Sequence, residues 1–189
     1  SRHLAFRAIR FSGVAGACKL DVQHGNLEAR RTAGLEVDLA HGKLTVENVA
    51  DVVLRGQHAP VHGSDVAGRA EIETSFGDVR FERVGGELRA RIEHGGVTAS
   101  DVAGGANVET TFDGVTLERV AGPLEAVVQH GGVEAKGLAR GARIRASGAD
   151  VTLDGFSGSI DLEVERGVAV AQPRRAFRDQ GRAHAGADE

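Results

Sequence analysis

The chain has 189 residues, of which 41% are hydrophobic and 4% aromatic, with 27 glycines, one cysteine and a formal net charge of −4. This length supports one domain with its own core, and the mixed charges provide no basic field for nucleic acid. There is no run of about 18 apolar residues to span a membrane. Cys18 has no second cysteine with which to form an internal disulfide.

An aliphatic residue recurs every 17 or 18 residues through almost the whole chain. A fixed period of this size is typical of a solenoid, in which each coil buries its apolar side against its neighbours. We call this residue the mark of its coil and count positions from it, with the mark as position 0. The marks are Ile9, Leu27, Leu44, Val61, Val79, Val97, Val115, Val133, Val151 and Val168.

The pattern is already present in the first coil. Apolar residues follow Ile9 at positions 2, 5, 9, 11 and 13, namely Phe11, Val14, Cys18, Leu20 and Val22. Spacing by two predicts short strands, because alternate side chains of a strand point to the same side. Cys18 therefore occupies an inward position, where a thiol behaves as a small hydrophobic residue.

The middle coils keep these inward positions and add a longer repeat. Residues 72–99 match residues 108–135, 36 positions further on, at many sites, and residues 64–68 recur unchanged as residues 100–104. Two types of coil therefore alternate in the middle of the chain.

The pattern stops after Ala171. Residues 172–189 contain four arginines and little apolar content besides Phe177. We expect one domain over residues 1–171, followed by a C-terminal cap and flexible tail over residues 172–189. The chain also starts at Ser1 and lacks methionine, so we expect a trimmed or processed piece.

The predicted fold is all-β, a single-domain parallel β-helix (β-solenoid) of about ten coils of 17–18 residues. A β-sandwich of hairpins would need turn signals between antiparallel strands and would have no fixed period.

Flat rings recur three residues before most marks. Neighbouring coils lie about 4.8 Å apart, so these rings would stack as a ladder at one corner. Phenylalanine and histidine interchange in this column, which favours a structural role. The ring ladder consists of Phe6, His24, His41, His58, Phe76, His94, Phe112 and His130.

Charged residues of opposite sign recur four residues after the marks. If neighbouring coils stack in register, these charged residues would pair from coil to coil and help to determine which coils are neighbours. We expect a similar pairing of Glu73, Arg91 and Glu109 on another face. The charge ladder consists of Arg31, Asp65, Arg83, Asp101 and Arg119.

Two alternatives would give these columns a chemical role. His24, His41 and His58 could bind zinc, but stacked parallel rings do not converge on one ion. Asp65 and Asp101 could form a catalytic pair, but they lie two coils apart with Arg83 between them. No P-loop, Ser-His-Asp set or HExxH motif is present. We therefore predict no catalytic, cofactor-binding or metal-binding residues, no cofactor and no enzymatic activity.

The segments 94–97, 100–104 and 108–115 resemble the bacterial adhesin-like β-helix family, a domain family of unknown function. The resemblance covers about residues 9–170. It implies a right-handed parallel β-helix in the bacterial cell envelope or another extracytoplasmic setting, often behind a membrane anchor. It implies no catalytic residues.

Three functions remain open. The first is a non-enzymatic scaffold or adhesin-like domain that presents a charged side face to an unidentified protein or cell-surface partner. The second is a bactofilin-like solenoid that polymerises through its end coils, because open coil ends are unpaired strand edges. The polar residues at both termini favour capped ends and hence the first function. The third is a carbohydrate-active β-helix enzyme, which requires a carboxylate-lined groove.

Overall fold

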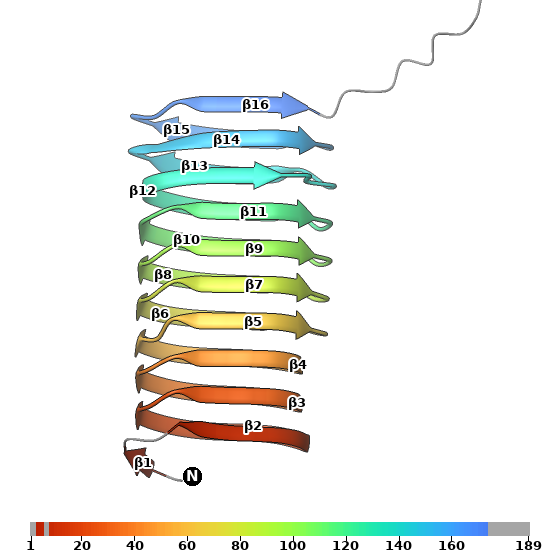
Figure 1. The fold of residues 1–189 in the computed structure, drawn as a ribbon. Coiled ribbons are helices and arrows are strands. Elements are labelled where there is room, and N and C mark those ends of the chain that lie inside the picture. The colour runs from red at the N-terminus through yellow and green to blue at the C-terminus, as the bar shows by residue number, and fades with distance from the viewer. Residues whose placement is uncertain (1–2, 6–7, 174–189) are drawn as a thin grey trace, which may run out of the picture.

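The computed structural model describes residues 3–5 and 8–173, which form a parallel β-solenoid (Figure 1). Strands make up 78% of the structure, no helix occurs in the described residues, and the coils complete about nine turns. The predicted fold class is thus confirmed. Phe6 of the ring ladder and residues 174–189 of the expected cap and tail lie outside the described residues.

Sixteen strands follow one another in the described part of the chain. They are β1 (His3–Ala5), β2 (Ile9–His24), β3 (Leu27–His41), β4 (Leu44–His58), β5 (Val61–Val66), β6 (Ala70–Phe76), β7 (Val79–Val84), β8 (Leu88–His94), β9 (Val97–Val102), β10 (Ala106–Phe112), β11 (Val115–Val120), β12 (Leu124–Lys136), β13 (Ala142–Ser147), β14 (Ala149–Phe156), β15 (Ile160–Glu165) and β16 (Ala169–Pro173).

Each coil contributes one strand segment to each of two parallel stacks. The front stack contains the first halves of β2, β3 and β4, then β5, β7, β9, β11, the end of β12, β14 and β16. The rear stack contains β1, the second halves of β2, β3 and β4, then β6, β8, β10, the start of β12, β13 and β15. In Figure 1 the front strands run from left to right as the chain climbs, which is the sense of a right-handed coil.

The two segments of a coil join into one strand in the first three coils and are separate in later coils. The first coil has 18 residues, yet β2 stays continuous and takes up the additional residue in a bulge between Val14 and Ala17. Coils of 17 residues, such as the one from Leu27, run through the corner as one continuous strand, β3. The 18-residue coil from Val79 has one more residue after position 5, where Gly85 and Gly86 break the strand between β7 and β8. The extra residue is thus absorbed at the corner and leaves the strand register unchanged.

The marks align from coil to coil, with one correction. Val151 pairs with Ala169 and Leu153 with Ala171, so the last mark is Ala169 and not Val168. The period of 18 continues to the end, and Val168 is 64% exposed. The prediction was wrong by one residue because alanine is a weaker hydrophobic signal than the valine beside it.

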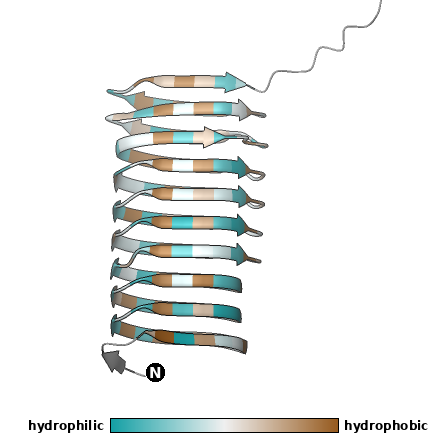
Figure 2. Ribbon diagram, viewed as in Figure 1, coloured by the Kyte–Doolittle hydropathy of each residue, from teal (hydrophilic) through white to brown (hydrophobic). Residues whose placement is uncertain are grey.

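The core fills the space between the two stacks. Positions 0, 2, 5, 9, 11 and 13 of the coil from Val79 are buried, as predicted, and outward positions alternate with them. Figure 2 shows this alternation along front strands such as β7 and β11. Cys18 is half-buried, because the first coil has little structure beneath it.

Candidate functional site

The ring ladder runs along the corner that follows the rear strands. Five consecutive rings are stacked nearly face to face, with centroids 4.6–5.3 Å apart and interplanar angles of 3–15°. These rings belong to His58, Phe76, His94, Phe112 and His130. Separations of this size lie within the range of favourable aromatic contacts.

The lower end of the ladder differs from the expected parallel stack. His24 and His41 meet at 77°, and His41 and His58 meet at 69°, at centroid distances of 4.9 and 4.8 Å. Nδ1 of His41 hydrogen-bonds the carbonyl oxygen of Ala40, 2.5 Å away, which holds this ring out of the stack. Edge-to-face contact is also favourable for aromatic rings, so the column stays in contact throughout the described coils.

The backbone at this corner explains why glycine so often follows the ring. Gly42 has a φ of +144°, and a Cβ there would collide with the backbone of Gly25 in the neighbouring coil. Coils pass each other too closely at this point for a side chain. The rings beside the corner thus keep their spacing, and Phe76 and Phe112 remain 42% exposed.

The charge ladder occupies a second corner, whose backbone was not foreseen from the sequence. Position 4 is left-handed in every coil from the first to the one that begins at Val151, with φ between 52° and 71°. Most residues avoid this conformation, which favours Gly, Asn and Asp. The column consists of Gly13, Arg31, Asn48, Asp65, Arg83, Asp101, Arg119, Gly137 and Gly155.

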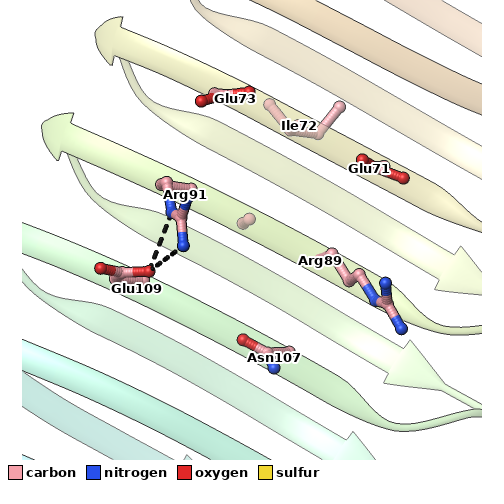
Figure 3. A pocket seen from close by; sticks show the side chains of 8 residues that line it. Glu71, Ile72, Glu73, Arg89, Arg91, Asn107 and Glu109 are labelled. Atoms are coloured by element: carbon pink, nitrogen blue, oxygen red, sulfur yellow. Dashed lines mark hydrogen bonds and ion pairs between the residues drawn. The ribbon is translucent and has the colours of Figure 1, made fainter.

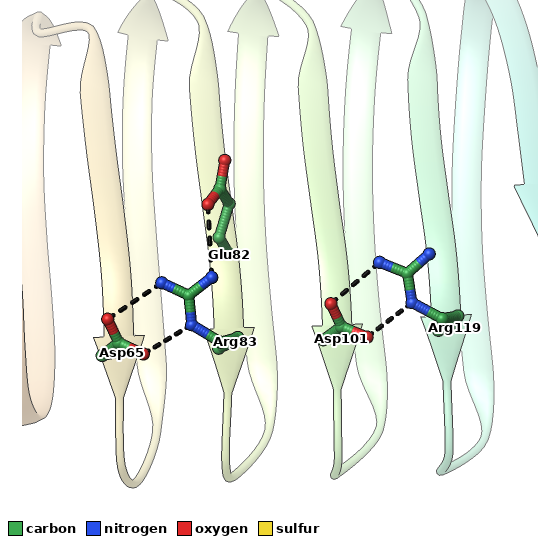
Figure 4. Close-up of polar contacts among 5 residues, drawn as sticks. All are labelled: Asp65, Glu82, Arg83, Asp101 and Arg119. Atoms are coloured by element: carbon green, nitrogen blue, oxygen red, sulfur yellow. Dashed lines mark hydrogen bonds and ion pairs between the residues drawn. The ribbon is translucent and has the colours of Figure 1, made fainter.

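Two arginine–aspartate pairs form within this column (Figure 4). Arg83 donates from Nε and Nη2 to the two carboxylate oxygens of Asp65, at 2.6 and 2.9 Å. Arg119 contacts Asp101 in the same bidentate way, at 2.5 and 2.8 Å. These hydrogen bonds lower the pKa of each aspartate and raise the pKa of each arginine, and Coulombic attraction adds to both shifts.

The charge ladder is therefore two separate pairs and not a continuous chain. Arg83 also contacts Glu82 within its own coil, at 3.4 Å, and bonds downward to Asp65. Asp101 above it is hydrogen-bonded by Arg119, and Arg83 acts on Asp101 only through Coulombic attraction. Arg31 forms no ion pair among the described residues. A bidentate aspartate has both oxygens occupied, so neither Asp65 nor Asp101 is placed as a free general base.

The outer side of the rear stack carries rows of charge that change sign from coil to coil. Lys19 binds Glu36 at 2.7 Å near one end. Near the other end, Arg143 and Arg145 bind Asp161 and Glu163, at 3.1 and 3.2 Å. Such pairs match each coil to its neighbour, and their exposed positions make each one a weak contributor to stability.

A shallow hollow of about 290 Å³ lies on this charged face, over β6, β8 and β10 (Figure 3). Arg91 donates from Nε and Nη2 to Glu109, at 2.9 and 2.7 Å, and Arg89 binds Glu87 at 3.0 Å. Glu71 and Glu73 line the other side of the hollow and form no ion pair among the described residues. The expected pairing of Arg91 thus holds for Glu109 and not for Glu73.

His62 is a residue that sequence reasoning missed. It lies at an outward position of β5, and its Nδ1 is buried without a hydrogen-bond partner. Burial lowers its pKa, and the nearby charges of Lys43 and Arg80 lower it further. In the sequence, His62 stands one residue after its mark, where most other coils have threonine or a charged residue. This pattern does not distinguish a buried imidazole from an exposed one.

The described residues contain no cluster of three or more His, Cys, Asp or Glu side chains that could hold a metal ion. Within the same residues there is no helix with the length and hydrophobicity to cross a membrane. Comparison with protein-family models, curated proteins and solved structures finds no match to the chain. Membership of the adhesin-like β-helix family thus stays a prediction.

Proposed function

We propose that this protein is a non-enzymatic β-solenoid scaffold whose charged rear face binds a protein or surface partner in the bacterial cell envelope. The observation that carries the proposal is the hollow of Figure 3. Glu71 and Glu73 form an acidic row without an ion pair to any other described side chain, although Arg89 attracts Glu71 electrostatically. The strand that bears them is held on both sides by β4 and β8. The row is therefore presented to a partner in a fixed geometry.

The partner that fits this row carries basic groups spaced to reach two carboxylates on one strand. Alternate residues of a strand project from the same face. Glu71 and Glu73 therefore stand side by side, while Arg89 and Arg91 on the next strand repel a partner placed one coil too high. Charge complementarity of this kind contributes more to specificity and association rate than to raw affinity.

Charge reversal on the rear face tests the proposal. The double variant Glu71→Lys/Glu73→Lys should no longer co-sediment with isolated bacterial cell envelopes at low ionic strength, whereas the wild type should pellet and be released by added salt. Glu82→Lys/Glu118→Lys changes the net charge equally on the front stack and should pellet like the wild type. Equal pelleting of all three proteins would refute a specific rear-face interaction.

An assay for carbohydrate cleavage tests the non-enzymatic part of the proposal. The wild type should release no reducing ends from soluble bacterial and plant polysaccharides. Release that is lost in Glu71→Gln or Glu73→Gln would instead identify the hollow as a hydrolytic site.

A further inference from the structure

The C-terminal end of the solenoid is an open edge in the described part of the chain. β15 pairs only with β13, and β16 pairs only with β14. The inward side chains Ile160, Leu162 and Val164 of β15 are half-buried, although the equivalent positions of inner coils are buried. A parallel edge with an apolar row behind it is a template for another strand.

Among the described residues, the N-terminal end is open in a complementary way. The first half of β2 pairs with β3 above it, and β1 contacts only the second half, from Asp21 to His24. Ile9 and Phe11 pack against the core from one side and remain half-buried.

The two ends of the described solenoid match in phase. Its first strand is the rear half-coil β1, and its last strand is the front half-coil β16. A second copy placed head to tail would therefore set its β1 on β15 and the first half of its β2 on β16, without a step or a gap. All strand pairs within the chain are parallel, and this junction would be parallel as well.

The backbone hydrogen bonds between coils also point toward such a junction. In inner coils the N–H at position 0 donates to the carbonyl just before the next mark, as from Val79 to Gly96 and from Val151 to Val168, at 2.9 and 2.8 Å. Ala169 holds position 0 of the last described coil. Its N–H is the next donor of this column, and it faces the open end.

Side-chain volume at position 2 also continues across the junction. Large and small residues alternate without exception up the front stack, and the column ends on a small residue, Ala171. In a head-to-tail stack the next member is Phe11 of the second copy, which is large. The column reads Phe11, Ala29, Val46, Gly63, Phe81, Ala99, Leu117, Ala135, Leu153 and Ala171.

The sequence that follows β16 does not have the pattern of another coil. Counting from Ala169, the inward positions 5, 9, 11 and 13 fall on Arg174, Arg178, Gln180 and Arg182. Arginine is almost never fully buried without a partner. The N-terminal half-coil of a second copy fits the open end better than the chain's own continuation does.

We propose that the C-terminal coil binds the N-terminal coil of a second copy of this chain, so that copies associate head to tail. The contact is heterologous, because a different surface is used on each copy, and such contacts generate open-ended chains. This proposal is independent of the rear-face function, since it uses the ends of the rod and leaves both side faces free.

Single-end variants test the proposal in analytical ultracentrifugation. The wild-type chain should show concentration-dependent association above its mass of 19.7 kDa. Ala171→Lys places a charge at the C-terminal end, and Phe11→Lys does so at the N-terminal end; each variant alone should be monomeric, because every junction needs both ends. An equimolar mixture should form dimers and nothing larger, because one intact junction remains. Val170→Lys and Ser12→Lys, on outward positions of the same strands, should associate like the wild type.

Circular dichroism checks that each variant keeps its β-structure. If Phe11→Lys loses it, Phe11→Ser removes the ring without adding a charge and takes its place. A wild type that stays monomeric at all concentrations overturns the proposal. Association of residues 1–173 alone, when residues 1–189 remain monomeric, also overturns it. Association that survives both end variants, or a mixture that remains monomeric, also overturns it.

Discussion

The ring of Phe81 fills the space beside Gly63 in which a side chain of Gly63 would lie. A Cβ on Gly63 would overlap three atoms of this ring. Phe81 is 1% exposed and has Ala99 on its other side. The alternation of coil types seen in the sequence is thus a packing device, in which each large residue is accommodated by a small one above and below it.

Gly63→Ala should destabilise the protein by about 1–3 kcal/mol, because it overpacks the core against Phe81. Phe81→Leu in the same chain should recover part of this loss by clearing the space. Urea unfolding followed by circular dichroism measures both changes. Gly34→Ala is the matched control, since its Cβ would make an ordinary 3.6 Å contact with Ala17; a cost equal to that of Gly63→Ala would contradict the packing explanation.

The left-handed corner predicts opposite effects at two of its positions. Gly137→Ala should cost about 1–2 kcal/mol, because φ is +69° there although no atom lies closer than 3.6 Å to the added Cβ. Arg31→Gly should gain up to about 1 kcal/mol by relieving the same strain. Gly132→Ala serves as the control, because Gly132 has an ordinary φ and its Cβ would make an ordinary 3.6 Å contact with the carbonyl oxygen of Asp150. Equal effects at Gly137 and Gly132 would show that φ is not the cause.

The ring ladder should tolerate exchange of one ring for another. Phe112→His keeps contact with His94 and His130, whereas Phe112→Ala removes both contacts. The alanine variant should therefore be less stable than the histidine variant by about 0.5–1.5 kcal/mol for each lost ring contact. Thermal and urea unfolding at pH 8 compare the two variants. Identical stability would mean that the rings are in contact without contributing to folding.

The Asp65–Arg83 pair predicts a loss of stability in acid. The pKa of Asp65 is lowered in the folded state, so its contribution is present above the unfolded pKa of about 3.9 and disappears as pH falls through the folded pKa. Asp65→Asn keeps a residue suited to left-handed backbone and should be less stable than the wild type at pH 6, with the difference vanishing in strong acid. Urea midpoints from pH 6 to pH 2 measure it, and Glu93→Gln, on an outward position without an ion pair in the described structure, should change little. A pH-independent difference would contradict the pairing.

His62 should titrate below the usual histidine range. Its folded pKa is lowered by burial, so the unfolded chain binds a proton first, and stability falls as pH drops below about 6.5. NMR titration of the imidazole protons measures the pKa directly. Unfolding of His62→Gln should be less pH-dependent than that of the wild type between pH 7.5 and 5.5. An imidazole that titrates at or above 6.5 would contradict burial as the controlling effect.

The coil register was accessible from the sequence because solenoid coils repeat the same inward positions. Val79, Leu88 and Ile92 are buried as their spacing predicts, and the rings and charges line up as columns. The sequence did not predict which charged residues of a column pair with one another. Arg83 lies between Asp65 and Asp101 and hydrogen-bonds only the Asp65 carboxylate below it, a choice that depends on side-chain conformation and not on spacing.

The left-handed backbone at position 4 was also not predicted from the sequence. The residues at position 4 were identified as a charge column, yet their shared left-handed φ could be read only from the coordinates, since arginine is an unfavourable residue there. The burial of His62 Nδ1 was likewise not visible, because a strand's outward position gives no information on how neighbouring side chains cover it.

We propose that the rear face binds the partner, while the rings of the ladder only keep neighbouring coils in contact. Envelope co-sedimentation of two folded variants tests this most directly. His94→Phe should bind envelopes like the wild type, because it exchanges one ring of the ladder for another, whereas Glu71→Lys/Glu73→Lys should fail to bind. Loss of binding in His94→Phe together with full binding by the rear-face variant would contradict the account.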